Sequence, residues 1–447
     1  MTDAQCAGFE MPCETRWIDR LQVVKKILGR LLHTGFFHIF GAGTINKIIS
    51  ALLSIVVVRI LSKEDFGIYS YVYNLISFFV LFNGLGATSA LLQLGCEAQS
   101  NGAIASVLRY ATKVGVLFDL LLAVFVLIAS FAPMGFPESS LLLRLYALYP
   151  FVIFLFDIRI MIFRIKLYNK QYAFITNIQT LLLALLSIAG ALCWQVVGLI
   201  VGQYLAYILS GSIAWFVGMR LRVQEGEEAD FDFDKKAYWK ISVASSINNG
   251  LGSALTLVGV FFVGLFCGNE TAVAEYKVAT TIPFALLFIP SAVVTYLYPY
   301  FVKHRDDVEW SLSRYLQLSM VGLAAYGSVV VLFCVFGGSI VSLVFGSQYE
   351  SATQAFRIIM IGFFVTAALR QPTGNLLVTQ RRLWFNTATG VISLLVCCAA
   401  CAALIPIWGI EGAAWAYTFS MIAGALCSVP YYIFVLLKKR EGGIGEK

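Results

Sequence analysis

Five charged side chains lie deep inside long apolar stretches of this sequence, and they are the residues best placed to do chemistry. They are Lys47, Asp119, Asp157, Arg159 and Arg370. A charge in hydrocarbon is costly, so each normally faces a water-filled cavity or a partner of opposite charge. Asp157 and Arg159 are two residues apart and project about 200° apart on a helix, so they cannot pair with each other. Each therefore needs a partner from another helix or a wet cavity.

Two hypotheses account for these charges. In the structural one, they form buried ion pairs that hold helices together. In the functional one, they line a water-filled lumen in which an unpaired cation binds an anionic cargo such as a phosphate. The excess of cations favours the second, with Lys47, Arg159 and Arg370 binding substrate. Asp119 and Asp157 are then candidate sites for a coupling ion, although both could equally be ion-pair partners.

Polar side chains accompany two of these positions. Asn46 adjoins Lys47, and Asn248 with Asn249 occupies the corresponding place in the second half of the chain. Such amides suit hydrogen bonding to sugar hydroxyls or phosphate oxygens, although Asn–Asn contacts between membrane helices are the alternative. Arg370 precedes Gln371-Pro372, where the missing N–H and the ring clash predict a kink that frees backbone groups towards a cavity.

The composition determines which elements must position these residues. Hydrophobic residues make up 59% of the chain and charged residues 13%, with a mean hydropathy of +0.81. A soluble globular protein has about 25% charged residues, which excludes a soluble multi-domain enzyme. The apolar stretches reach the roughly 20 residues of a spanning helix, twice the length of a β-barrel strand. The chain is therefore predicted to be an all-α membrane protein.

Apolar runs bounded by charge, Gly or Pro predict twelve transmembrane helices. Their ranges are about 38–60, 67–93, 106–131, 141–163, 172–193, 196–218, 240–267, 277–301, 312–335, 351–378, 384–405 and 413–437. Lys and Arg are concentrated on the side of the amino terminus, whereas the opposite loops and their margins hold only Arg59, Lys63 and Lys277. By the positive-inside rule both termini are cytoplasmic. The net charge of +7 is spread over these short loops, which indicates topology rather than a nucleic-acid surface.

The chain also repeats itself. The run that begins at Thr44 is echoed by the run at Ser246, and Gly202-Gln-Tyr-Leu-Ala-Tyr is echoed by Gly412-Ala-Ala-Trp-Ala-Tyr. Six helices separate the copies, so both have the same orientation, and two parallel six-helix repeats are expected. The predicted organisation is a cytoplasmic tail with an interfacial amphipathic helix at 1–37, a bundle at 38–218, a cytoplasmic linker at 219–239, a bundle at 240–437 and a tail at 438–447.

Two motifs with chemical connotations are interpreted as structural. Cys397, Cys398 and Cys401 have metal-like spacing but no His or acidic partner nearby, so no metal site or cofactor is expected. Asp230-Phe-Asp-Phe-Asp234 matches the Asp-x-Asp of sugar-nucleotide transferases, yet its charged neighbours are typical of a solvated loop. Membrane glycan polymerases and ligases place their catalytic groups in a long outside loop, and the outside loops predicted here are short. The chain is therefore not expected to be an enzyme.

Several stretches resemble a known family. The run Arg59-Ile-Leu-Ser-Lys-Glu-Asp-Phe-Gly-Ile-Tyr69, followed by Asn83-Gly-Leu-Gly, is similar to the opening of the polysaccharide-biosynthesis flippases. The runs Arg381-Arg-Leu-Trp384 and 405–417 resemble later loops of the same proteins. These are the O-antigen (Wzx-type) and capsule flippases of the multidrug/oligosaccharidyl-lipid/polysaccharide exporter (MOP) superfamily.

This resemblance implies a V-shaped, MATE-like bundle that works by alternating access. It further implies a bacterial inner-membrane protein that flips undecaprenyl-pyrophosphate-linked repeat units of lipopolysaccharide O-antigen, capsule or exopolysaccharide. A proton or sodium gradient is the candidate energy source, and a glycan polymerase and a chain-length regulator are the candidate protein partners. No residue role is carried over, because family members scatter their intramembrane charges.

Three alternatives remain open. A cation-coupled multidrug exporter of the same superfamily would carry acidic residues in an otherwise apolar lumen, which the cationic excess disfavours. A membrane glycan polymerase or ligase belongs to a different class. A flippase for another lipid-linked glycan, such as a peptidoglycan precursor, is not distinguished by the sequence.

Overall fold

The computed structural model describes residues 36–98, 100–132, 136–220 and 233–444, and all regular secondary structure in these ranges is helical. The predicted interfacial helix within 1–37 and most of the linker lie outside the described residues. The first half comprises α2 (Phe36–Ile60), α3 (Lys63–Val80), η1 (Asn83–Gly86), α4 (Ala87–Glu97), α5 (Asn101–Ala129), α6 (Ser139–Leu145), α7 (Tyr149–Ile165) and α8 (Asn169–Arg220).

The second half begins five residues earlier than predicted, because Asp234 caps its first helix by accepting hydrogen bonds from two amides of the first turn. Its elements are α9 (Lys235–Cys267), α10 (Glu270–Leu286), α11 (Phe288–Lys303), α12 (Val308–Val335), α13 (Gly337–Phe345), η2 (Ser347–Ala352), α14 (Thr353–Val365), η3 (Thr366–Arg370), α15 (Gln371–Thr379) and α16 (Leu383–Ile444). This cap is the observed role of Asp234, the last residue of the Asp-x-Asp-like run; residues 230–232 lie outside the described ranges.

Two of the long helices are hairpins. Ten apolar segments of the described chain are long enough to cross a membrane, and α8 and α16 are far longer than one crossing requires. Each is broken by a residue with positive φ, Gln195 in α8 and Gly409 in α16. A Cβ on Gly190 would collide with the carbonyl of Gly198, and one on Gly412 with the carbonyl of Leu404, so each chain doubles back on itself. Two crossings apiece are consistent with the twelve predicted passes.

The hairpins correct the register of one predicted repeat. Gly198 and Gly412 each lie three residues after the break, and each packs against the backbone eight residues earlier. Gly412 is therefore the structural equivalent of Gly198, one helical turn before the Gly202 that the sequence echo suggests.

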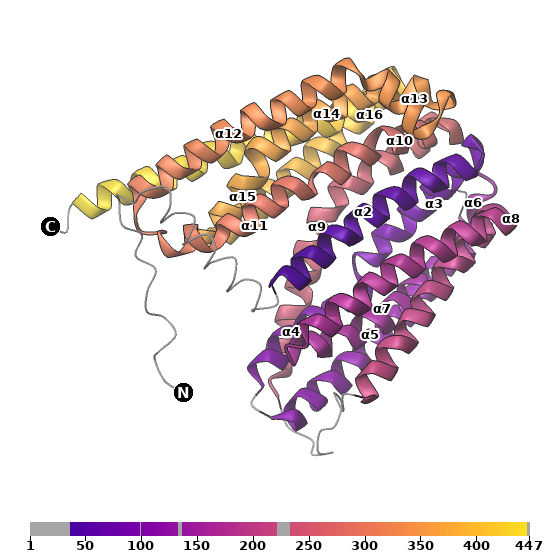
Figure 1. The fold of residues 1–447 in the computed structure, drawn as a ribbon, viewed down its shortest axis with the longest axis horizontal. Helices are drawn as coiled ribbons and strands as arrows, with labels where there is room; N and C mark the ends of the chain where they lie inside the picture. The colour runs from indigo at the N-terminus through magenta and orange to yellow at the C-terminus, as the bar shows by residue number, and fades with distance from the viewer. Residues whose placement is uncertain (1–35, 99, 133–135, 221–232, 445–447) are drawn as a thin grey trace, which may run out of the picture.

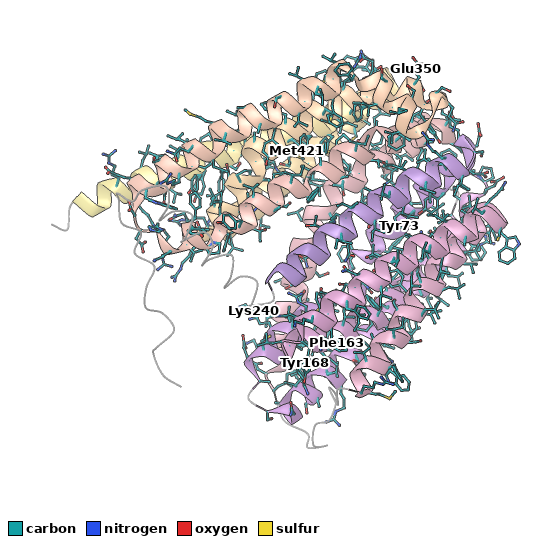
Figure 2. All side chains as sticks on the ribbon, viewed as in Figure 1. Tyr73, Phe163, Tyr168, Lys240, Glu350 and Met421 are labelled. Atoms are coloured by element: carbon teal, nitrogen blue, oxygen red, sulfur yellow. The ribbon has the colours of Figure 1, made fainter. Side chains whose placement is uncertain are left out.

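The helices form two lobes arranged as a V (Figure 1). α2 to α8 make up the N lobe and α10 to α16 the C lobe, and the lobes meet at one end, where α3 packs along α10. Contact there is close, because a Cβ on Gly67 would collide with the carbonyl of Glu270. The predicted outside turns lie at this closed end. The predicted cytoplasmic turns and the carboxyl end of α16 lie at the open end; in Figure 2, Glu350 marks the closed end and Lys240 the open end.

Helix α9 belongs to both lobes. Near its start, Trp239 donates a hydrogen bond to the Tyr110 hydroxyl, and the Ser242 hydroxyl donates to the Leu85 carbonyl, both in the N lobe. Further along, Leu251 packs against Gly390 of α16 in the C lobe. α9 thus runs along the boundary between the lobes (Figure 1). It connects them at positions further from the closed end than the contact of α3 with α10.

The outer surface of the lobes is apolar. On α5, Leu117, Leu121, Val124 and Ile128 recur every three or four residues and are 59%, 61%, 54% and 65% exposed. An exposed apolar stripe of this length suits contact with lipid rather than water. The protein is therefore a multi-pass membrane protein.

Candidate functional site

Lys47 lies on an exposed face of α2. Its helical periodicity places it with Ser50, about 150° away from the apolar stripe of Ile45, Ile48 and Leu52. That stripe is 48%, 49% and 55% exposed and faces lipid. The polar face is exposed as well, and α2 lies at the front of the N lobe beside the open end of the V (Figure 1). Lys47 is thus on the polar part of the exposed surface of α2, apart from the apolar stripe that suits contact with lipid.

Of the three predicted asparagines, only Asn46 lies on α2 beside Lys47, and the other two belong to α9. Asn46 is half-buried, and its side-chain oxygen is buried without a hydrogen-bond partner. Asn249 is exposed on α9. Asn248 lies in the same helix, but its side chain is outside the described part of the structure.

The structure brings the two predicted carboxylates together in the N lobe. Asp119 of α5 is fully buried, and its Oδ1 accepts a hydrogen bond of 2.8 Å from the Gly84 amide. That amide is available because the second predicted span is broken at η1, where Gly84, Leu85 and Gly86 all have positive φ. Asp119 Oδ2 is buried without a partner, and Asp157 of α7 is close enough to interact electrostatically with it.

A hydrogen-bonded network beside this pair was not predicted. The Tyr146 hydroxyl donates to Gln203 Oε1 (2.7 Å), and Gln203 Nε2 donates to the Tyr69 hydroxyl (3.0 Å), which links α3, the turn after α6, and α8. Tyr207, one turn beyond Gln203, lies beside Asp157. Tyrosines scattered over three segments carry no sequence signal of their own. The polar interior of the N lobe therefore extends from the carboxylates towards the closed end.

Arg370 occupies the C lobe. It ends a π-turn, η3, in which the Gln371 amide bonds to the Thr366 carbonyl, and Pro372 follows. This is the predicted interruption of the tenth span, expressed as a widened turn. The Arg370 guanidinium adjoins a cavity of about 230 Å³. The remaining lining residues are Thr366, Gln371, Gly374, Asn375, Asn386, Thr389 and Ser428.

The five intramembrane charges form no ion pair with one another among the described residues. Arg159 is half-buried on α7, and Lys47 and Arg159 belong to the N lobe whereas Arg370 belongs to the C lobe. The charges are therefore not gathered into one cluster. Lys47 is exposed on α2, Arg159 is half-buried on α7, the two carboxylates lie inside the N lobe, and Arg370 adjoins a cavity of the C lobe.

Charged residues at the closed end join the two lobes, and the sequence analysis missed this role. Lys63 Nζ lies 2.6 Å from Glu275 Oε1 and donates to the Gln348 carbonyl at 3.0 Å. Glu275 also accepts from the Ser351 hydroxyl. Arg59 donates to the carbonyls of Val344 and Leu343 at the end of α13. From the sequence alone, Arg59 and Lys63 are only outside-loop cations, because their partners are more than 200 residues away in the chain.

Lys277 was grouped with those loop cations, and it lies two residues beyond Glu275 on α10. Its side chain is half-buried on the helix that packs against α3. It is thus an additional intramembrane cation near the junction of the lobes.

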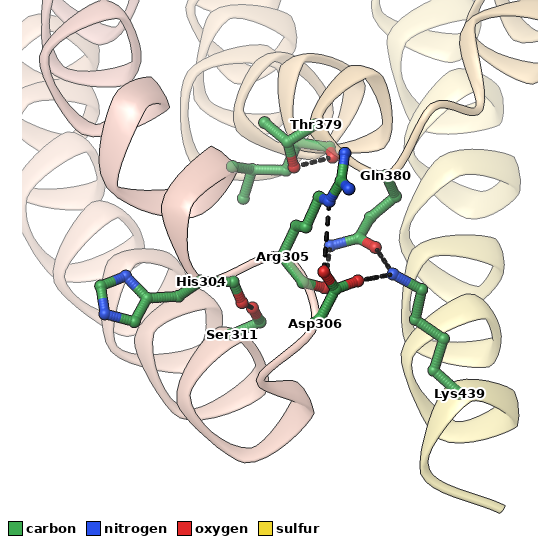
Figure 3. Close-up of polar contacts among 8 residues, drawn as sticks. His304, Arg305, Asp306, Ser311, Thr379, Gln380 and Lys439 are labelled. Atoms are coloured by element: carbon green, nitrogen blue, oxygen red, sulfur yellow. Dashed lines mark hydrogen bonds and ion pairs between the residues drawn. The ribbon is translucent and has the colours of Figure 1, made fainter. Parts of the chain in front are cut away.

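At the open end a polar cluster ties the turns of the C lobe together (Figure 3). Lys439 Nζ donates to Gln380 Oε1 (2.8 Å), to the Arg305 carbonyl (3.2 Å) and to Asp306 Oδ1 (3.3 Å). Arg305 also donates to Asp306 Oδ2 at 3.3 Å. The hydrogen bonds from Arg305 and Lys439 hold the pKa of the Asp306 carboxyl below its usual value.

The cysteines with metal-like spacing lie in a different environment from a metal site. Cys397 and Cys401 are buried in the apolar core of the C lobe. Among the described residues, no group of three or more His, Cys, Asp or Glu side chains is arranged to hold a metal ion.

The two lobes of membrane-spanning helices define a class of multi-pass membrane proteins, and a comparison with family models identifies the family of this chain. The model of a family described as "Polysaccharide biosynthesis protein" matches residues 32–304. The chain therefore belongs to the polysaccharide biosynthesis protein family. A search of curated protein sequences found no significant match.

Solved structures share the fold. A multidrug resistance MATE family transporter of the MOP superfamily, inward-facing, has a TM-score of 0.73 at 13% identity, with 89% of this chain and 96% of that chain covered. The lipid II flippase MurJ, inward closed, has a TM-score of 0.71 at 14% identity, covering 90% and 89%. An outward-facing MATE transporter scores 0.64 at 14% identity, covering 91% and 96%. The fold is that of the MOP superfamily.

Proposed function

We propose that this protein is a flippase that moves undecaprenyl-pyrophosphate-linked oligosaccharide repeat units across a bacterial inner membrane. The observation that carries the proposal is Lys47, an exposed cation on the polar face of α2 that has no ion-pair partner among the described residues, in a member of the polysaccharide biosynthesis family. An ammonium group without a carboxylate partner suits a phosphate-bearing cargo. The fold shared with a lipid II flippase supports a lipid-linked glycan as the substrate class.

In this proposal, transport is a change of access and involves no bond making. The open end is assigned to the cytoplasm because the predicted cytoplasmic turns, which hold most of the Lys and Arg residues, lie at that end. The same rule assigns both termini to the cytoplasm. The higher TM-score against the inward-facing transporter supports the same assignment. The lipid tail stays in the bilayer while the pyrophosphate and sugars pass between the lobes beside Lys47, Arg159, Asn46 and Asn249.

Asp119 and Asp157 are proposed to bind the coupling ion, a proton or Na⁺. A buried carboxylate oxygen without a partner is costly, and its retention in the N lobe calls for an occupant. Binding of the ion would bias the equilibrium between the inward- and outward-open states if its affinity for the two carboxylates differs between those states.

The experiment is deletion and complementation. Loss of the gene should abolish long-chain surface polysaccharide while the lipid-linked repeat unit accumulates inside. Lys47→Ala and Arg159→Ala should fail to rescue at normal membrane levels. Lys113→Ala, which removes an exposed cation from α5, should rescue fully. Normal surface glycan in the deletion strain, with no other flippase present, would overturn the proposal.

The buried carboxylate pair also favours a second candidate, a cation-coupled multidrug exporter. Acidic residues in the N lobe would suit a cationic drug or its coupling ion. For that candidate, overexpression should raise drug resistance and Asp119→Asn should remove the gain, with surface glycan unchanged. The flippase proposal expects that overexpression leaves drug resistance unchanged and that Asp119→Asn lowers surface glycan.

A further inference from the structure

The cavity beside Arg370 is a separate polar compartment inside the C lobe. It lies between the segment from η3 to α15 and the two arms of α16, which contribute Asn386 and Thr389 from one arm and Ser428 from the other. Arg370 is about nine residues before the end of its span at Thr379, roughly 13 Å along the helix. It is therefore deep in the hydrocarbon region.

Among the described residues that line this cavity, Arg370 is the only charged one. Its one assigned side-chain bond is a long one, 3.4 Å to the Ser393 hydroxyl, and its Nε is buried with no hydrogen-bond partner. The guanidinium packs directly over Gly424, where a Cβ would collide with it, so the backbone of α16 fixes its position. A positive charge is thus held without a counter-charge among the described residues.

The neutral lining groups complete a site for an anion. Some have internal partners: Asn375 Nδ2 donates to the Gln371 carbonyl, and Thr389 Oγ1 donates to the Asn386 carbonyl. The Ser428 hydroxyl, in contrast, is buried without a partner. A cation and a hydroxyl donor that are both unsatisfied around one cavity call for an acceptor that carries negative charge.

The size of the cavity limits the occupant. Pockets for drug-sized ligands occupy about 300–1,000 Å³, whereas one water takes about 30 Å³ of liquid. A volume of about 230 Å³ suits one small anion with a few waters. An oligosaccharide needs more room than this.

We propose that the C-lobe cavity binds one small anion, a halide or a phosphate group, on the Arg370 guanidinium with Ser428 as a second donor. The anion neutralises the cation in the core of the C lobe and fixes the widened turn of η3 against α16. Its source is either free anion from the aqueous phase or the phosphate of a lipid headgroup. The proposal does not depend on the flippase assignment, since the site lies within one lobe.

Thermal unfolding of the full-length protein in nanodiscs of uncharged lipid tests this. At constant ionic strength, sodium gluconate is replaced by sodium chloride in one arm and by sodium phosphate in another. In a third arm, gluconate is kept and polyprenyl phosphate is added to the lipid. We expect a saturable rise of several degrees in the midpoint in at least one arm. Chloride or inorganic phosphate would identify a free anion, and a response to polyprenyl phosphate alone would identify a headgroup.

Variants assign the response to the cavity. Arg370→Gln should abolish the anion dependence, and Arg370→Lys should retain it with weaker affinity. Asn386→Asp places a carboxylate in the same cavity, so it should remove the dependence while the protein stays folded even if Arg370→Gln does not. Lys113→Gln, outside the cavity, should respond like the wild type. An unchanged midpoint in every arm, or an equal rise in folded Asn386→Asp, would overturn the proposal.

Discussion

Asp119 combines an observed structural hydrogen bond with a proposed role in transport. Its Oδ1 satisfies the Gly84 amide in the broken segment between α3 and α4, and its Oδ2 is unpaired. The first bond holds an irregular backbone inside the membrane, where an unsatisfied amide is expensive. The second oxygen contributes nothing to that role and is available to a coupling ion.

Substitutions at Asp119 separate the two roles. Asp119→Asn keeps an oxygen acceptor for the Gly84 amide, so we expect near-normal thermal stability and loss of gradient-dependent transport. Asp119→Ala leaves the amide unsatisfied and should lower the free energy of unfolding by about 1–3 kcal/mol. Thermal unfolding and glycan rescue of both variants check this. Equal destabilisation by both would show that the negative charge itself is structural.

At the scale of the element, the two hairpins depend on bare glycine backbone. Gly190 and Gly198 allow the arms of α8 to touch, and any side chain there collides with main-chain atoms that cannot rotate away. Gly198→Ala should therefore destabilise the protein by about 1–3 kcal/mol. Gly211→Ala is the matched control on the same element, because nothing lies within 4 Å of the Cβ that this substitution adds. Equal thermal midpoints for the two variants would refute the close approach.

The polar cluster at the open end makes one contribution to stability that depends on pH. Since the pKa of Asp306 is lowered in the folded protein, its contribution is present above the unfolded value of about 3.9 and is lost as pH falls through the lowered pKa. Asp306→Asn should lower the thermal midpoint slightly at neutral pH, because the carboxylate is 77% exposed. The difference from wild type should shrink towards zero below about pH 4. A constant difference across pH would contradict it.

For the whole molecule, the closed end is held by polar contacts that must break if the lobes exchange access. The Lys63–Glu275 pair has side chains only 19% and 16% exposed, so removing one partner leaves a largely buried charge and costs more than the loss of an exposed pair. Glu275→Gln removes the charge and should shift the equilibrium towards separation at this end. Distances between spin labels on the two lobes measure the shift. Glu309→Gln, which breaks the exposed pair with Arg440 at the other end, is the control.

Much of this architecture could be predicted because it follows from hydropathy. Apolar runs located the passes, and the predicted interruptions near 194 and 408 coincide with the breaks at Gln195 and Gly409. The proline after Arg370 indicated an irregular turn. In contrast, the pairing of Lys63 with Glu275 and of Gln203 with two tyrosines depends on tertiary packing, which no local pattern encodes.

For the candidate site, the sequence predicted which charged residues lie deep within the spans, but it did not predict which of them lie close together. Asp119 and Asp157 do lie together, although α5 and α7 had no sequence feature that required it. Lys47 and Arg370 lie in different lobes, and the cavity beside Arg370 depends on the approach of both arms of α16. The position of a charge within a predicted span indicates which charges are costly to bury in the membrane. Tertiary packing determines which of them lie close together.

The position of α9 between the lobes has a consequence for how the protein is made. The ribosome completes α2 to α8 first, yet the surface around Leu85 and Gly86 is covered by Ser242, which belongs to the second half. At about 5–20 residues per second, the N lobe waits seconds for α9 before that surface is buried. A fragment ending at Arg220 should therefore be degraded by proteases, whereas one ending at Cys267 should resist them. The smallest amino-terminal fragment expected to fold stably thus includes α9, although the first sequence repeat ends before that helix.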